Sequence, residues 1–152
     1  MSLIERLGDD YQNLPDILDE YERGLGLVEQ NLNIKGKSLQ AANVEQPSWQ
    51  LYYDTRRSEL YSLVKYFEAK MSATRGKLYK KYTEKYTREL SERGKDKYID
   101  NEETFLSQNE IYLEIKETYE KYVAVCDAFR ARGYALNNIT KIRVASLEDV
   151  LI

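Results

Sequence analysis

Histidine is absent from this 152-residue chain, and cysteine, proline and glycine are scarce. Without histidine, the chain lacks the usual general base near neutral pH and the commonest zinc ligand. A single cysteine, Cys126, excludes an internal disulfide framework and favours a cytoplasmic location. Two prolines and seven glycines are too few for a turn-rich β protein. No apolar run approaches the roughly 18 residues of a membrane span, and the first 20 residues hold no signal-peptide core. We therefore expect a helical protein without membrane contact.

What the chain has in excess is charge and tyrosine. Tyrosine occurs 14 times, against three phenylalanines and one tryptophan, which suits half-exposed seams and interfaces. The formal net charge of −3 conceals three segments of different sign. Residues 1–55 carry four Lys or Arg and ten Asp or Glu, residues 56–97 carry thirteen and six, and residues 98–152 carry six and ten. The basic middle segment, more than the total charge, is expected to determine which partners the chain attracts.

Apolar residues recur at helical spacing in two long stretches, and each forms a near-heptad seam. Pro47 is expected to open the first stretch, which runs from Ser48 to about Leu90. The first seam comprises Leu60, Val64, Phe67, Met71, Thr74, Leu78 and Tyr82; the second comprises Phe105, Gln108, Tyr112, Ile115, Tyr119, Tyr122, Cys126 and Phe129. Two long helices with matching seams, joined by the polar stretch 91–96, predict an all-α, antiparallel, coiled-coil-like hairpin.

Short helices are expected at both ends of the hairpin. Residues 13–31 predict a first helix with Pro15 in its first turn. Gly133 is expected to end the second long helix, and Asn138 is expected to cap a last short one. The chain is thereby divided into an acidic N-terminal segment, residues 1–46, and a helical-hairpin domain, residues 47–152.

Catalytic and metal-binding constellations are largely missing from the sequence. It contains no Gly-rich phosphate loop, no Cys/His cluster and no Gly-x-Ser-x-Gly elbow. Carboxylates cluster at residues 16–22 and 110–120, but helical metal sites of this kind pair Glu with Glu-x-x-His, so solvated faces are favoured. Cys126 falls in the second seam, where a small buried side chain is favoured over a reactive thiol. We expect no enzymatic activity, no metal and no cofactor.

The remaining chemistry lies in the basic stretch ATRGKLYKKYTEKYTREL, residues 73–90. From Lys70 to Arg88 there are seven basic residues and one acid, Glu84. On a helix that turns about 100° per residue, one flank of the seam is cationic and the other carries tyrosines. The cationic stripe is Lys70, Lys77, Lys81 and Arg88, and the tyrosine flank holds Tyr79 and Tyr86. Phosphates bind cationic surfaces through counterion release, and tyrosines stack on unpaired bases. The alternative is an ordinary lysine-rich coiled-coil flank that pairs with an acidic partner helix.

Two motifs, in this order, resemble the UvsY-type recombination mediators of tailed phages. The first is RGKLYKKY, residues 75–82, which is similar to the family's basic-x-basic-Leu element followed by tyrosines. The second is KYVAVCDAFRARGYALNNITKIR, residues 121–143. It is similar to an amphipathic helix that ends in a basic residue, then Gly, an aromatic residue and Ala, before a short helix. The resemblance covers roughly residues 50–145, about two thirds of the chain.

The resemblance implies a non-enzymatic protein that forms a ring-shaped homo-oligomer in the cytoplasm of the infected bacterium. Such mediators bind single-stranded DNA, displace the single-strand-binding protein and load a RecA-like recombinase. By residue match, Arg75 and Lys77 take the place of the family's basic pair. Together with the stripe, the expected nucleic-acid-binding residues are Lys70, Arg75, Lys77, Tyr79, Lys80, Lys81, Lys85 and Arg88.

Arg75 and Lys77 project to opposite sides of the seam, at about +60° and −100° from Leu78. A single straight helix cannot direct both side chains at one phosphate. Either the strand crosses the helix, or neighbouring subunits share the site, or Arg75 makes a structural contact.

Oligomer formation also has a physical basis outside the resemblance. Two helices bury only one stripe each, and apolar residues outside the seams leave surface that a second copy could cover. These residues are Leu51, Leu63, Leu106 and Val123. An oligomeric coiled-coil scaffold or adaptor without nucleic-acid binding is therefore the alternative function, and a helical carboxylate metalloenzyme is a third.

Overall fold

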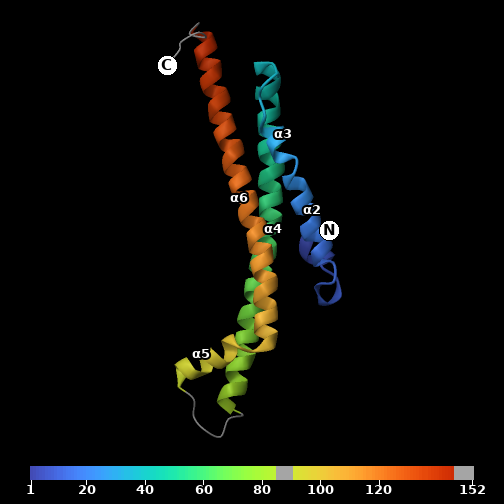
Figure 1. Cartoon of the computed structure of the whole chain (residues 1–152), viewed down its shortest axis with the longest axis vertical. Helices are drawn as coiled ribbons and strands as arrows, with labels where there is room; N and C mark the ends of the chain where they lie inside the picture. Colours follow the sequence, from blue (N-terminus) through green and yellow to red (C-terminus); the bar gives the residue numbers. More distant parts are fainter. Residues whose placement is uncertain (85–90, 146–152) are drawn as a thin grey trace.

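The protein, seen here in a computed structural model that describes residues 1–84 and 91–145, consists of two long antiparallel helices with shorter ones beside them (Figure 1). The elements are α1 (Leu3–Arg6), the 3-10 helix η1 (Asp9–Tyr11), α2 (Leu14–Leu25), α3 (Val28–Leu32), α4 (Leu39–Glu84), α5 (Glu92–Asp100) and α6 (Glu103–Val144). No strand occurs in the described residues, so the predicted all-α class is confirmed. The two long helices, α4 and α6, form the hairpin; the expected end of the first near Leu90 lies outside the described residues.

Burial along the two seams is deepest in the middle of the hairpin and fades toward α5. The buried core includes Leu60, Val64 and Phe67 of α4 together with Ile115, Tyr122, Cys126 and Phe129 of α6. The next seam positions of α4, which are Met71, Thr74 and Leu78, are only half-buried, and the last, Tyr82, is buried again. The heptad spacing therefore marks the correct face, but less apolar surface stabilises the hairpin near α5.

The long helix α4 begins at Leu39, ahead of the proline that is expected to open it. The Ser38 hydroxyl accepts a hydrogen bond from the backbone N–H of Ala41 at 3.1 Å, which caps the first turn. Pro47 lies inside the helix with its ring exposed, although it removes one backbone donor. Packing outweighs that cost, because Ala42 is buried and its carbonyl accepts a hydrogen bond from Arg132 of α6. The expected domain boundary after residue 46 therefore falls inside a continuous helix.

The second long helix, α6, runs through Gly133 and Asn138 without a break. The expected helix end at Gly133 and the separate C-terminal helix are therefore wrong. A Cβ on Gly133 would lie 3.0 Å from Nε2 of Gln46 on α4. That Nε2 donates to the Phe129 carbonyl at 2.6 Å, and Oε1 of Gln46 accepts from Arg132 at 2.7 Å. The glycine permits a close approach of two helices instead of ending one.

The N-terminal segment packs along the hairpin as several short pieces (Figure 1). The single helix expected over residues 13–31 is divided at Gly26 into α2 and α3. The apolar side chains of the N-terminal segment join the core of the long helices. They are Leu3, Leu7, Leu14, Ile17, Leu18 and Tyr21. Leu63 is fully buried in the same core. The expectation that it leaves surface for a second copy is therefore wrong. The reason is that the N-terminal segment packs against this part of α4.

Carboxylates of α2 pair with basic residues elsewhere in the protein. Glu20 accepts hydrogen bonds from Arg6 at 2.6 Å and from Arg56 of α4 at 3.2 Å. The bond from Arg6 is the main reason that the pKa of Glu20 lies below its usual value. Glu22 lies 3.0 Å from Nζ of Lys121 on α6. Some carboxylates of the acidic N-terminal segment thus form ion pairs between helices, whereas the sequence predicts a solvated face for them.

The stretch 91–96, predicted as a polar link, begins the helix α5 instead. The Ser91 hydroxyl accepts a hydrogen bond from the backbone N–H of Gly94 at 3.1 Å, as an N-cap does. Ile99 is completely buried. A helix of nine residues with one fully buried apolar side chain has little independent stability.

Two glycines inside helices are expected to respond to alanine in opposite directions. A Cβ on Gly76 would meet nothing within 4 Å, so Gly76→Ala should raise the free energy of unfolding by about 0.5–1 kcal/mol. A Cβ on Gly24 would lie 2.7 Å from the hydroxyl of Tyr122, which is buried and donates to the Tyr21 carbonyl. Gly24→Ala should therefore lower the free energy of unfolding by about 1–3 kcal/mol. Urea denaturation followed by circular dichroism measures both changes, and a stabilised Gly24→Ala protein would contradict the described contact.

Candidate nucleic-acid interface

Six of the eight expected nucleic-acid-binding residues are described, and they lie at the end of the hairpin where α4, α5 and α6 meet, here called the distal end (Figure 1). It comprises residues 69–84 of α4, all of α5 and the first turn of α6. Lys70, Arg75, Lys77, Tyr79, Lys80 and Lys81 are all on α4. Lys85 and Arg88 lie outside the described residues. Because α4 is unbroken here, the wheel that separates Arg75 from Lys77 applies to the folded protein.

Arg75 is held by two carboxylates of α5. Its Nη1 lies 3.3 Å from Oδ1 of Asp96, and its Nη2 lies 2.5 Å from Oδ1 of Asp100. The guanidinium also lies over the ring of Phe105, with Cζ 4.9 Å from the centroid. Of the three possibilities that the sequence left open for Arg75, this arrangement corresponds to a structural contact within the chain.

Tyr79 is engaged by the same helix. Its hydroxyl donates to the carboxylate of Glu92, whose oxygens lie 2.7 and 2.8 Å away. This hydrogen bond is the main reason that the pKa of Tyr79 is raised. Nζ of Lys95 lies 4.8 Å from the centroid of the Tyr79 ring. α5 thus contacts both the hydroxyl and the ring of Tyr79.

Glu102, which caps the start of α6, completes the acidic side of the distal end. Its Oε1 accepts a hydrogen bond from the hydroxyl of Tyr82 and lies 3.1 Å from Nζ of Lys81. These two contacts, the Tyr82 bond first, hold the pKa of Glu102 below its usual value. We call Glu92, Asp96, Asp100 and Glu102 the acidic cover. It explains part of the charge segregation, because basic residues of the middle segment have carboxylate partners within the same chain.

Three lysines on the other side of α4 remain accessible, and we call Lys70, Lys77 and Lys80 the open flank. All three are exposed. Nζ of Lys70 lies 5.3 Å from the Tyr66 ring centroid, and Lys80 is 3.9 Å from Glu84, with both of these charged side chains mostly exposed. Lys77 forms no ion pair with any residue in the described part of the chain. Because α4 carries no Asp or Glu between Glu68 and Glu84, the potential along this flank is positive.

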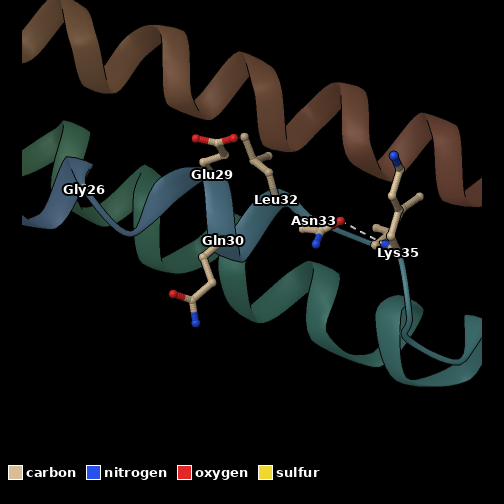
Figure 2. A pocket seen from close by; sticks show the side chains of 7 residues that line it. Gly26, Glu29, Gln30, Leu32, Asn33 and Lys35 are labelled. Carbon is tan, nitrogen blue, oxygen red and sulfur yellow. Dashed lines mark hydrogen bonds between the residues drawn. The ribbon is translucent and has the colours of Figure 1, made fainter.

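An open depression lies beside α3, at a distance from the lysines (Figure 2). It is lined by Gly26, Glu29, Gln30, Leu32, Asn33, Ile34 and Lys35. Figure 2 shows Leu32 directed toward α6 and Gln30 directed away from it. The side chain of Asn33 accepts a hydrogen bond from the backbone N–H of Lys35 at 3.0 Å. One acid, one base and no nucleophile make a poor catalytic set, so we place no active site here.

Other candidate centres in the described residues offer little chemistry. Residues 1–84 and 91–145 contain no group of three or more His, Cys, Asp or Glu that could hold a metal ion. Over the same ranges, no helix has the length and apolar character that crossing a bilayer requires. Cys126 is buried; desolvation and a hydrogen bond with Asp54 raise the pKa of its thiol to about 12. A reactive thiolate is therefore scarce at neutral pH.

No protein-family model, curated protein or solved structure matches this chain. Pairing with an acidic helix was an alternative open from the sequence, but the sequence did not predict that the short helix α5 supplies most of the carboxylates of the acidic cover. The signal was present, because Glu92, Asp96 and Asp100 recur every four residues and so share one face of a helix.

Proposed function

We propose that this protein is a non-enzymatic, single-stranded DNA-binding recombination mediator that binds DNA through the open flank. The observation that carries the proposal is the carboxylate-free part of α4 between Glu68 and Glu84, which presents Lys70, Lys77 and Lys80 to solvent. Small residues lie among them at Ala73 and Gly76. A phosphate backbone could therefore approach the helix closely and release counterions from the lysines.

The wider role rests on the resemblance to UvsY-type mediators. On that basis the protein displaces the single-strand-binding protein and loads a RecA-like recombinase, as a ring-shaped homo-oligomer in the bacterial cytoplasm. Exposed apolar side chains support self-association: Leu51 is 69% exposed and Leu106 is 44% exposed. A ring would repeat the open flank in every subunit, so weak contacts in each would add along one strand.

An oligomeric scaffold without nucleic-acid binding is the second candidate. It is favoured by Leu106 and Leu113, which lie seven residues apart on the outer side of α6 and are both exposed. Both candidates predict an oligomer, but only the mediator predicts that the oligomer carries DNA. Native mass spectrometry with and without an oligo-dT strand separates them, because it reports the number of subunits and the bound strand together.

Charge reversal on the open flank is expected to weaken DNA binding. The Lys70→Glu, Lys77→Glu double variant should bind oligo-dT at least about tenfold more weakly at low salt. The slope of log affinity against log salt concentration should become shallower by about 1.4, since each phosphate contact on a single strand contributes about 0.7. Fluorescence anisotropy over a salt series measures both quantities.

The matched control reverses two exposed lysines away from the distal end, Lys35→Glu and Lys141→Glu. It makes the same change in net charge, so its affinity should stay much closer to that of the unmodified protein. Equal losses in the two variants would mean that the open flank is not the surface. Absence of binding by the unmodified protein at low salt would overturn the proposed function.

A further inference from the structure

The helix α5 is attached to α4 through ion pairs, hydrogen bonds and one aromatic pair, in which the Tyr98 ring stacks on that of Tyr82 with 5.4 Å between centroids. Of its side chains only Ile99 and Lys95 are buried. The carboxylates that reach α4 are mostly exposed: Asp96 and Asp100 keep 61% and 56% of their side-chain surface. Exposed ion pairs contribute about 0–1 kcal/mol each. α5 is therefore among the parts of the fold that can open without unfolding the core.

The groups that α5 occupies are the ones best suited to a nucleic acid. The guanidinium of Arg75 is bound by two carboxylates, in a fork geometry that a phosphate can replace. The Tyr79 hydroxyl donates to the carboxylate of Glu92. The aromatic rings of this flank would be stacking surfaces for unpaired bases if α5 moved away.

We propose that the part of the acidic cover on α5 (Glu92, Asp96 and Asp100) occupies a second nucleic-acid-binding face of α4, formed by Arg75 and Tyr79, and that single-stranded DNA displaces it. The inference rests on the proposed function, and it concerns how that site is regulated. The strand first meets the open flank, where no cover competes with it. Its phosphates then exchange with the carboxylates of Asp96 and Asp100 at Arg75, and α5 detaches. The same exchange explains how Arg75 and Lys77, on opposite flanks, could serve one strand that crosses the helix.

Displacement also makes binding selective. A weak polyanion that contacts only the lysines of the open flank would leave α5 in place. A strand whose bases also stack on the Tyr79 ring makes additional contacts with the covered face. The binding free energy of these contacts offsets the loss of the contacts between α5 and α4. The cover thus favours unpaired DNA over anions that cannot stack.

Removing charge from the cover is expected to tighten DNA binding. The Asp96→Asn, Asp100→Asn variant frees Arg75, and oligo-dT should bind about 3- to 10-fold more tightly, as expected when two exposed ion pairs no longer compete. The matched control is Glu110→Gln, Glu114→Gln on α6, where both side chains are exposed and neither forms an ion pair with a described residue. It changes the net charge equally, and its affinity should rise by less than about twofold.

Hydrogen exchange on the unmodified protein tests displacement without any substitution. Saturating oligo-dT should lower the amide protection of residues 92–100, while protection around Phe67 and Tyr122 in the core is kept. If oligo-dT binds but α5 stays protected, and the two double variants bind alike, the inference is overturned and the proposed function stands. If no oligo-dT binds at low salt, both are overturned.

Discussion

Replacing Phe129 with alanine is expected to lower the free energy of unfolding by about 3–5 kcal/mol. Phe129 is fully buried, and its ring stacks on that of Tyr53 with 4.6 Å between centroids and 20° between planes. The ring of Trp49 lies 6.4 Å away. Truncation leaves a cavity between α4 and α6, and it also removes an aromatic pair that contributes about 0.5–1.5 kcal/mol beyond burial. Urea denaturation followed by circular dichroism measures the loss, at one protein concentration because self-association would link stability to concentration.

The control for Phe129 lies five residues further along the same helix. Tyr134 is 66% exposed, so Tyr134→Ala should change the free energy of unfolding by less than about 0.5 kcal/mol. Phe129→Leu keeps most of the apolar volume and should fall between the two alanine variants. If Phe129→Ala cost no more than Tyr134→Ala, the described aromatic core would be wrong.

Arg132→Ala is expected to lower the free energy of unfolding by about 2–4 kcal/mol. The Arg132 side chain is only 3% exposed and lies where α3, α4 and α6 meet. Its Nε donates to the Leu32 carbonyl at 3.1 Å, and its Nη1 donates to Oε1 of Gln46 at 2.7 Å and to the Ala42 carbonyl at 3.4 Å. Truncation leaves these buried acceptors without their donor. The midpoint of urea denaturation should therefore fall clearly.

Arg130 provides the comparison for Arg132. Its side chain is half exposed and pairs with Asp127 within α6 at 2.6 Å, so Arg130→Ala should cost less than about 0.5 kcal/mol. Arg132→Met separates hydrogen bonding from packing, because methionine fills much of the volume but donates nothing. Because the hydrogen bonds are lost, Arg132→Met should also lower the free energy of unfolding. An Arg132→Met protein as stable as the unmodified one would show that packing alone stabilises the contact between α3, α4 and α6.

The course of the long helices could be predicted from the sequence, but their ends could not. A stripe such as Leu60, Val64 and Phe67 repeats over many turns, so many residues report the same face. A helix end is decided by a few residues whose local preference can be overridden from outside. Pro47 and Gly133 both read as helix boundaries, yet each lies inside a helix because α4 and α6 pack closely through Gln46 and Arg132.

The candidate site could be predicted in part for a related reason. The helical wheel places Arg75 and Lys77 on opposite flanks, and this requires only that α4 be continuous. The partners of Arg75 are 21 and 25 residues further along the chain, at Asp96 and Asp100. Their four-residue spacing shows that they share a helix face, but nothing local specifies against which surface that face will pack. Charge in the basic stretch was therefore visible from the sequence, whereas its neutralisation by α5 was not.

The docking of the N-terminal segment on α6 has a consequence for synthesis of the chain. The Leu32 carbonyl is held by Arg132, 100 residues later, and the Tyr21 carbonyl is held by Tyr122, 101 residues later. At about 5–20 residues per second, a ribosome needs about 5–20 s to make that interval. During this time the part of the apolar face of α2 that packs on α6 has no final partner. The nascent chain is therefore most exposed to chaperones, and to premature association with other chains, before α6 emerges.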